Sequence, residues 1–522
     1  MRTRAFTAIL AALGSFGCAA HDDEPFEETA IVSEALTPVQ TCNQDPRVNS
    51  GLVPLAVCAG ARVFFDETFG GNGRTCGSCH PASNNFTVDA RFISTLPDND
   101  PLFVNTNPQF ELESLESTTA LRSPEALIRE NADGFQDLDH KFVARGTPHT
   151  LSLATSITRD PIDNTSASVQ QRTGWGGDGA PGDGTLRSFV DGAIKQHYTR
   201  DEARTPPGSF RVATETEKDQ VLAFQLALGR TSDINLNQVT FADAGAAAGK
   251  TAFMDPMAGR CNECHGNAGA NSLVSGKNRN FNTGTNRLPP DFGFGSFPDG
   301  RLMLDGGFGA TQPFSTGLQG PLPDAFGDGT FNTPPLIEAA DTGPFFHSHS
   351  SGVSFDPTGN IEGPIGFYDS PNFRNSPAAQ ELDIKFGGPI VIQPNIGILG
   401  RMLRVLNASF NLAMAKQRMD ASRLLNIQYW GYRDDIQKGL LNLASKELAD
   451  AIGVLKNTET PLHAAQQTSL ENARTLLAQA VAATDPAVRK SKTESALTIV
   501  QAAKNALGTN MNFQLGTGNL MF

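Results

Sequence analysis

The sequence predicts a mainly α-helical protein, with two related helical domains in tandem, long loops rich in Gly and Pro, and a helical extension at the C-terminus. Three observations predict this class. The stretch CAGARVFFDETFGGNGRTCGSCH at 58–80 is matched in order by AAGKTAFMDPMAGRCNECH at 247–265, and such self-similarity indicates a duplicated unit. The 51 Gly and 32 Pro residues among 522 indicate much loop. After position 396, apolar side chains recur every three or four residues, as in helices.

The repeat and the helical period divide the chain. We expect a first domain at 41–232, a second at 233–407 and the extension at 408–522. In each of the first two, a helix should lead into the repeated motif. The sequence at 281–331 is rich in Gly, Pro and Phe without a helical period, which predicts a long ordered loop over the second motif.

The extension should form a helical hairpin or a small bundle. The run ILGRMLRVLNASFNLAMAKQRM and the segment 436–455 have helical periodicity. Further helical stretches follow Pro461 and Pro486, each placed where a helix starts or breaks. Because this segment contains no recognisable chemistry, a packing or partner-binding role is expected.

The N-terminus has the features of an export signal. Arg2 and Arg4 precede a short apolar run at 5–13, and Cys18 is placed as in a bacterial lipoprotein signal. Residues 1–18 are therefore predicted as a signal peptide with a lipidated cysteine; cleavage after the two alanines that follow is the alternative. The acidic stretch at 19–40 would be a solvated tether. This predicts a periplasmic or cell-surface protein, attached to a membrane through lipid.

Composition limits the classes of binding partner and indicates the redox state of the cysteines. The formal net charge of −14 argues against nucleic acid and suits a cationic redox partner. Beyond the N-terminus, no stretch is apolar for the 18 or more residues that span a bilayer. Cys42 and Cys58 lie outside the two motifs, and spare thiols in an exported protein predict a disulfide. Two buried free thiols are the alternative.

The two motifs carry the chemistry. Each reads Cys-x-x-Cys-His, the attachment sequence of c-type haem. Each thiol can form a thioether with a haem vinyl group, and the His then lies under the iron as an axial ligand. A zinc site would place the two Cys pairs about 15–20 residues apart, and a thioredoxin-like pair explains neither the second motif nor the His residues. The sequence therefore predicts two haem c groups, held by Cys76, Cys79, His80, Cys261, Cys264 and His265.

Further motifs in the same order resemble the bacterial dihaem cytochrome c peroxidase and MauG family. VFFDETF precedes the first motif, and RGTPHTLSLA is similar to a segment near the domain junction. GWGGDGAPGDGTLRSF resembles the family's stretch with a Trp and Asp-Gly ahead of a helix. AFMD precedes the second motif, and FNTPPLIEAADTGPFFHSHSSG matches the segment that leads to that haem's second ligand. The resemblance covers about residues 55–408, so the extension has no counterpart in it.

The resemblance implies an exported oxidoreductase of the peroxidase type. The N-terminal haem would meet hydrogen peroxide or oxygen. The C-terminal haem, ligated on both faces, would relay electrons from a small electron-donor protein. Trp175 matches the family's Trp between the haems, so we expect it to carry charge. The dihaem rubber oxygenases are similar in architecture, which makes a dihaem oxygenase or a protein-modifying oxidase an alternative. A non-catalytic dihaem electron carrier is the third reading.

The first haem is expected to be open on one face. No His occurs between His80 and His140, so His80 should be its only strong protein ligand. The family's acid/base Glu matches Thr199, and His197 is close enough to serve instead, because His is the commonest acid/base near neutral pH. His140 and His149 are the other candidates for this role.

The second haem is expected to have Tyr368 as its second ligand. Met is absent between positions 303 and 402, which removes the peroxidase-type ligand, and the MauG branch uses a Tyr. A phenolate would stabilise ferric over ferrous iron. The alternatives are a buried Tyr without this role, or ligation by His347 or His349.

Calcium is a further candidate ion. The family's interdomain calcium draws on backbone oxygens that match Thr342 and Pro344, but its Asn ligand matches Gly146, which counts against the ion.

Overall fold

Helices make up most of the described chain, so the mainly α prediction is confirmed. The computed structural model describes residues 36–106, 121–123, 126–130, 143–157, 185–201, 203–288, 307, 313–315, 321–326, 329–351, 361–429, 431, 433–456 and 461–521. Contacts group Pro38–Phe522 as one unit. The predicted signal peptide with Cys18, most of the predicted tether, His140 and Trp175 all lie outside the described residues.

Two closely crossing helices hold the first half together, α3 (Leu55–Asp66) and α8 (Glu215–Leu226). A Cβ on Gly60 of α3 would lie 1.9 Å from the carbonyl oxygen of Gln220, so this approach requires glycine. The disulfide between Cys42 and Cys58 joins α1 to α3, which confirms the predicted bridge. The other helices and strands of this half are α1 (Pro38–Cys42), α2 (Pro46–Asn49), α4 (Cys76–Cys79), α5 (Ala90–Ser94), β1 (Leu127–Glu130), β2 (Val143–Gly146), α7 (Leu186–Ala193) and the π-helix η4 (Ile194–Tyr198).

In the second half, α9 (Ala244–Met254) takes the place that α3 takes in the first. Gly249 of α9 matches Gly60 in the sequence repeat. A Cβ on Gly249 would lie 2.0 Å from the carbonyl oxygen of Ile398 in α14 (Ile396–Gln428). The long helix α14 therefore packs on α9 as α8 packs on α3, so the repeat includes the partner helix of each half.

Short strands and helices complete the second half. The strands form antiparallel two-stranded pairs, β4 with β7, β5 with β6, and β3 with the C-terminal β8. Most of the predicted loop at 281–331 lies outside the described residues. The elements are β3 (Thr240–Phe241), α10 (Cys261–Cys264), β4 (Asn280–Phe281), β5 (Pro313–Ser315), β6 (Pro321–Phe326), β7 (Phe331–Asn332), α11 (Glu362–Phe367), α12 (Pro371–Arg374) and α13 (Pro377–Phe386).

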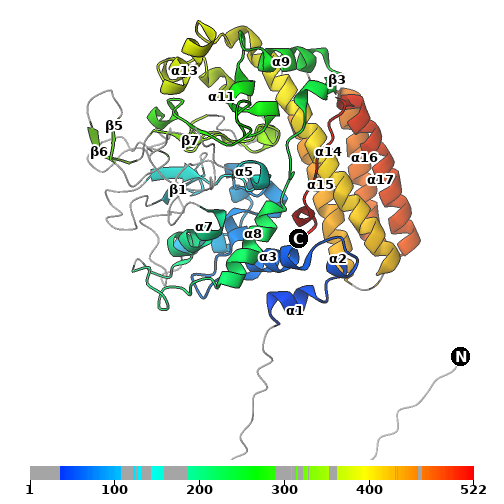
Figure 1. Ribbon diagram of the computed structural model, residues 1–522. Helices are drawn as coiled ribbons and strands as arrows, with labels where there is room; N and C mark the ends of the chain where they lie inside the picture. Colours follow the sequence, from blue (N-terminus) through cyan, green and yellow to red (C-terminus); the bar gives the residue numbers. More distant parts are fainter. Residues whose placement is uncertain are drawn as a thin grey trace, which may run out of the picture. The chain divides into compact units, whose positions relative to one another are not determined.

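The helices from position 396 onward form a bundle (Figure 1). α14 runs through position 408 and is followed by α15 (Asp434–Lys456), α16 (Ala464–Ala482) and α17 (Pro486–Leu507). Pro486 is the first residue of α17, after the N-cap Asp485. None of the described helices is long and apolar enough to cross a membrane.

The chain then returns from the bundle to both halves. β8 (Gly508–Thr509) pairs with β3, and Leu515 forms an isolated bridge with Arg230. The 3-10 helix η10 (Thr517–Leu520) contacts α3 and α8. Arg47 donates a hydrogen bond of 2.7 Å to the carbonyl oxygen of Leu520. The extension is therefore integrated into the fold rather than appended to it.

Candidate functional site

The two Cys-x-x-Cys-His motifs adopt the same local fold. In each, the four residues from Cys to Cys form a single helical turn, α4 or α10, and the His follows as its C-cap. The backbone N–H of His80 donates to the carbonyl of Cys76 over 2.9 Å, and that of His265 donates to Cys261 over 2.9 Å. Because a helical turn brings residues three apart onto one face, both thiols of a motif lie beside its His.

Both motif histidines use Nδ1 for a hydrogen bond to a backbone carbonyl, which leaves Nε2 available. Nδ1 of His80 lies 2.8 Å from the carbonyl oxygen of Phe86, and Nδ1 of His265 lies 2.9 Å from that of Pro334. A carbonyl only accepts hydrogen bonds, so Nδ1 carries the proton and Nε2 keeps a lone pair for a metal. Burial lowers the pKa of His80 and of His265 to about 4, which keeps both rings neutral at pH 7. This is the state that ligates iron.

The four motif cysteines are not joined in disulfides. Burial raises the pKa of Cys76 to about 11 and the pKa values of Cys261 and Cys264 to about 12, so they are thiols at neutral pH. The phenol of Tyr198 donates to Sγ of Cys76 over 3.0 Å. These features fit attachment sites rather than reactive thiolates, which need a lowered pKa.

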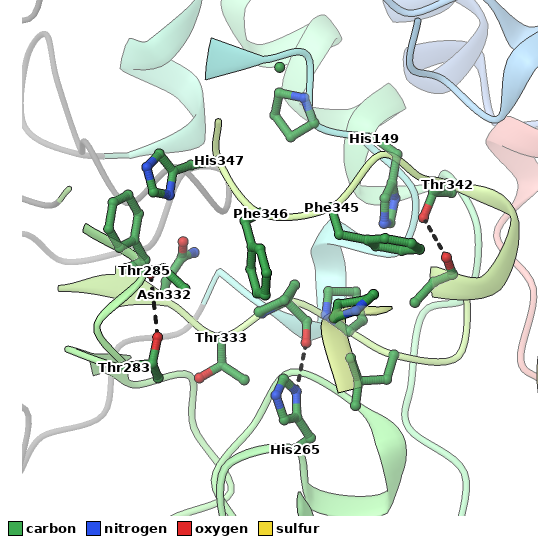
Figure 2. A pocket seen from close by; sticks show the side chains of 18 of the residues that line it. His149, His265, Thr283, Thr285, Asn332, Thr333, Thr342, Phe345, Phe346 and His347 are labelled. Carbon is green, nitrogen blue, oxygen red and sulfur yellow. Dashed lines mark hydrogen bonds between the residues drawn. The ribbon is translucent and has the colours of Figure 1, made fainter. Parts of the chain in front are cut away.

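One cavity reaches both motifs. It contains about 2570 Å³ of space free of protein atoms, part of it open to solvent, and both His80 and His265 line it. The wall is mostly apolar, with Phe189, Phe253 and Phe281 among its rings. Figure 2 shows part of the wall, with His265 below Thr333 and Phe346 in this view.

The cavity wall fits a bound group that carries both apolar surface and carboxylates. Thr147 Oγ1 and Thr150 Oγ1 are buried on this wall and make no hydrogen bond, so each hydroxyl can still donate one to a carboxylate. Buried polar atoms are normally paired, so such atoms indicate a missing partner. Arg145 is buried on the same wall, and a guanidinium is suited to binding carboxylates. Together with the thiols and neutral imidazoles, this set fits covalently bound haem.

His197, the first candidate for the acid/base role, faces the cavity. His197 lines the cavity with His80, and its charge contributes to lowering the pKa of His80. Leu186, Phe189, Ala193 and His197 line the cavity at spacings of three and four residues, so they share one face of α7 and η4.

The structure also describes His149, a further candidate for that role, and Thr199, which matches the family's acid/base Glu in sequence. His149 also lines the cavity and is buried. Thr199 is fully buried, is not among the lining residues, and donates from Oγ1 to the carbonyl of Asp201.

The predicted second ligand faces the same cavity near the second motif. Tyr368 caps α11 and lines the cavity together with Cys261 and Cys264, and burial raises the pKa of its phenol. His347 and His349 line it as well, and His347 stacks on Phe331 with ring centroids 4.1 Å apart. No Met lines the described part of this wall.

The residues that the resemblance links to calcium all belong to the cavity wall. Thr342, Pro344 and Gly146 all line it. A Cβ on Gly146 would lie 1.7 Å from Nε2 of His349, so the imidazole fills the space that a side chain at this position would need.

Sequence reasoning missed a second repeated segment, GTPHTLSLA at 146–154 and NTPPLIEAA at 332–340. In each half it leads into a 3-10 turn, η3 (Leu153–Thr155) or η8 (Ala339–Asp341), with Ser152 or Glu338 as N-cap. These caps, 186 residues apart, hydrogen-bond to each other over 2.6 Å. The matching Thr-Pro dipeptides were the available signal.

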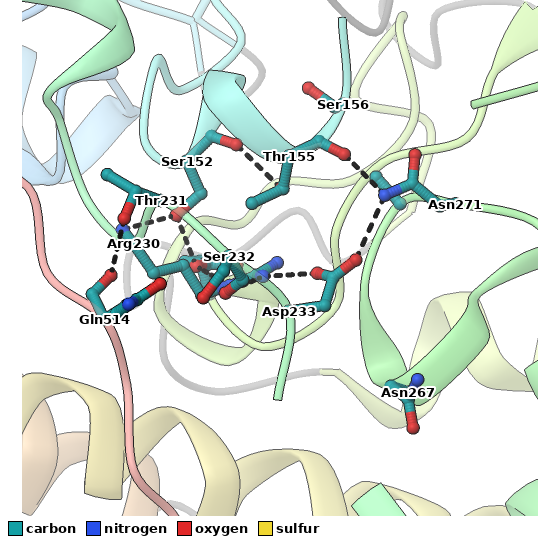
Figure 3. A network of polar contacts seen from close by, with 12 residues as sticks. Ser152, Thr155, Ser156, Arg230, Thr231, Ser232, Asp233, Asn267, Asn271 and Gln514 are labelled. Atoms are coloured by element: carbon teal, nitrogen blue, oxygen red, sulfur yellow. Dashed lines mark hydrogen bonds and ion pairs between the residues drawn. The ribbon is translucent and has the colours of Figure 1, made fainter. Parts of the chain in front are cut away.

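Asparagines that follow the two motifs bind these turns reciprocally. Asn271, after the second motif, donates to the carbonyl of Thr155 over 2.6 Å, as Figure 3 shows. Asn85, after the first motif, donates to the carbonyl of Asp341 over 3.3 Å. Each motif loop is thus bonded to the 3-10 turn of the other half, which fixes the two motifs relative to one another.

No protein-family model, curated protein or solved structure matches this chain.

Proposed function

We propose that the protein is an exported dihaem c-type oxidoreductase of the cytochrome c peroxidase/MauG type. It would reduce hydrogen peroxide, or activate oxygen, at the N-terminal haem, with electrons relayed through the C-terminal haem from a small donor protein. The observation that carries this proposal is the duplicated motif turn. Each turn offers two thiols and a neutral imidazole with Nδ1 bonded to a carbonyl, and both imidazoles face one cavity.

The cavity residues have distinct roles in this proposal. Cys76 with Cys79 and Cys261 with Cys264 would hold the two haems, which supply electron-transfer chemistry at iron when bound. His80 and His265 would each offer Nε2 as axial ligand. The backbone carbonyls of Phe86 and Pro334 orient these rings and make them more basic.

At the N-terminal haem, His197 would act as the general acid and base. Its imidazole lies on the wall that also bears His80, so it can accept a proton from a peroxide and return it to the departing oxygen. The apolar side chains around it, such as Leu186 and Phe189, exclude bulk water and strengthen this hydrogen bonding. Trp175 would carry charge between the haems.

Tyr368 supports a second candidate function, that of a dihaem oxygenase or a protein-modifying oxidase. Its place on the wall that Cys261, Cys264 and His265 also line, and the absence of Met from the described wall, support a phenolate ligand on the C-terminal haem. Such a ligand stabilises ferric iron and would suit a dihaem oxygenase or protein-modifying oxidase better than simple electron storage.

Three measurements test the proposal. Haem content should be two per chain, and Cys76→Ser with Cys79→Ser should leave one. The resting ferric protein should show a high-spin component that binds cyanide, together with peroxide consumption that depends on a reduced donor. Purely low-spin haem with no cyanide binding would instead identify an electron carrier, and the absence of covalent haem would overturn the whole proposal.

A further inference from the structure

The loop before the first motif is hydrogen-bonded to the end of the π-helix that contains His197. Asn72 is 4% exposed and belongs to the sequence GGNGR, at positions 70–74. Its Nδ2 donates to the carbonyl of His197 over 2.9 Å and to that of Thr199 over 3.0 Å. Its backbone N–H donates to the carbonyl of Tyr198 over 2.8 Å. One residue therefore satisfies three consecutive carbonyls.

These carbonyls stand at the end of the helix, where they need partners from outside it. The last carbonyls of a helix have no partner within it and need one from elsewhere. Here the partner comes from a loop 125 residues earlier in the chain, as the separation of Asn72 from His197 gives. Arg74 adds a longer contact of 3.4 Å to the carbonyl of His197 and is itself almost fully buried.

The loop is built to hold this position. The backbone N–H of Arg74 donates to Oδ1 of Asn72 over 3.1 Å, so the amide of Asn72 cannot rotate without losing bonds on both sides. A Cβ on Gly71 would lie 2.1 Å from the carbonyl oxygen of Tyr198, so the loop contacts the π-helix without a gap. Gly70 and Gly73 have positive φ angles of 58° and 97°, which glycine adopts readily.

The contact links haem attachment to the acid/base side chain. Asn72 lies four residues before Cys76, and Tyr198 joins the same two segments again through its hydrogen bond to Cys76. A π-turn is often found at a functional site, because its extra residue turns the following side chains. The direction of His197 therefore depends on where the last turn of η4 is held.

We propose that Asn72 is a positioning residue for His197: it fixes the end of η4 so that the imidazole is held toward the cavity that His80 also lines. This inference rests on the proposed function, since it needs an open haem at His80. It goes further by assigning a role to a residue that lies outside the cavity wall.

The test measures cyanide association with the fully haem-loaded ferric protein, across mildly acidic to mildly basic pH. Hydrogen cyanide must lose its proton to bind, so a nearby base accelerates the reaction. His197→Ala should slow association by about 100-fold. Asn72→Ala should slow it by about tenfold to 100-fold, because a small displacement of a catalytic group has such effects. The pH dependence should flatten in both variants.

A double variant shows whether Asn72 acts through His197. In the His197→Ala background, Asn72→Ala should cause no further slowing. Gly71→Ala displaces the same loop sterically and should reproduce the effect of Asn72→Ala, which keeps the test valid if the latter fails to fold. Asn519→Ala is the matched control: Asn519 is fully buried and donates to the carbonyl of Gly229, but it lies in the C-terminal segment and should change stability alone.

Two results would overturn the inference while leaving the proposed function intact. One is unchanged cyanide kinetics in both Asn72→Ala and Gly71→Ala. The other is an equal slowing by Asn72→Ala with and without His197. A wild-type protein that binds haem but no cyanide would instead refute the open haem, and the inference with it.

Discussion

Ser152 and Glu338 occupy matching positions in the two halves and hydrogen-bond to each other, with Oγ of Ser152 donating to Oε1 of Glu338 over 2.6 Å. Nε of Arg230 lies 2.7 Å from the same oxygen, and Arg230 and Glu338 are both fully buried. Arg230 also pairs with Asp233, whose carboxylate bonds to Asn271 (Figure 3). This network joins the turns on which both motif loops depend.

Glu338→Ala should destabilise the protein by about 3–5 kcal/mol, because it leaves the buried charge of Arg230 poorly compensated. Ser152→Ala should cost about 1 kcal/mol, and the double variant less than the sum, because the two side chains are in contact. Chemical unfolding of the haem-loaded protein measures these differences. Lys416→Ala removes a partly exposed ion pair with Asp420 and is the control. A loss in Glu338→Ala no larger than in this control would contradict a structural role for the network.

The disulfide should stabilise the folded protein measurably, although the loop that it closes is short. Cys42 and Cys58 are separated by 16 residues, and closing a loop of this size stabilises a protein by about 3 kcal/mol in the chain-entropy model. The double variant Cys42→Ser, Cys58→Ser should therefore unfold at lower denaturant concentration while keeping two haems. Equal unfolding midpoints with and without a reductant in the wild type would show that the bridge contributes nothing.

The sequence predicted the features that depend on local patterns. The helices of the extension follow from apolar spacing, and α17 begins at the Pro486 that marks its start. The pairing of Cys42 with Cys58 followed from counting thiols. The repeat likewise predicts a helix that leads into each motif, and α3 precedes α4 as α9 precedes α10.

The sequence could not predict contacts between distant segments. Asn72 reaches η4 across 125 residues, and no local pattern marks an asparagine as a helix cap for a later helix. Likewise, α14 looked like the start of a separate extension, yet Gly249 brings it against α9 as part of the second half. Such contacts depend on how the halves fold against each other rather than on propensity or spacing.

The stability of the bundle should depend on pH through Glu447. Burial raises its pKa to about 6; Asp450 adds to the increase, and Arg418 opposes it. The folded state therefore binds a proton more tightly than the unfolded state between about pH 4.5 and 6, so the free energy of unfolding should rise as the pH falls through this window and fall as the pH rises through it.

Glu447→Gln removes this proton while keeping an oxygen for Arg418. The free energy of unfolding of the variant minus that of the wild type should therefore increase by up to about 2 kcal/mol from about pH 4.5 to 7. Unfolding curves of both proteins at several pH values test this. Parallel pH profiles would show that the carboxyl titrates as if unfolded.

Tyr368 is placed so that one oxygen atom can be removed without disturbing its packing. Its ring contacts Phe367 and Phe373 with centroids 5.6 and 4.8 Å apart, and phenylalanine keeps both contacts. Burial, followed by the charges of Cys264 and Cys261, raises the pKa of the phenol, so it is protonated at neutral pH in the absence of a nearby cation. A bound ferric iron would supply that charge and favour the phenolate.

Tyr368→Phe should therefore change the ferric spectrum of one haem, by opening a coordination position or recruiting another ligand, and raise the reduction potential of that haem, because an anionic oxygen ligand no longer stabilises ferric iron. Absorption and electron paramagnetic resonance spectra, with a redox titration, measure both effects. Tyr429→Phe is the matched control, since Tyr429 follows α14 and does not line the cavity. If Tyr368→Phe matches the wild type while His347→Ala or His349→Ala alters the spectrum, a histidine is the ligand and Tyr368 is only a packed side chain.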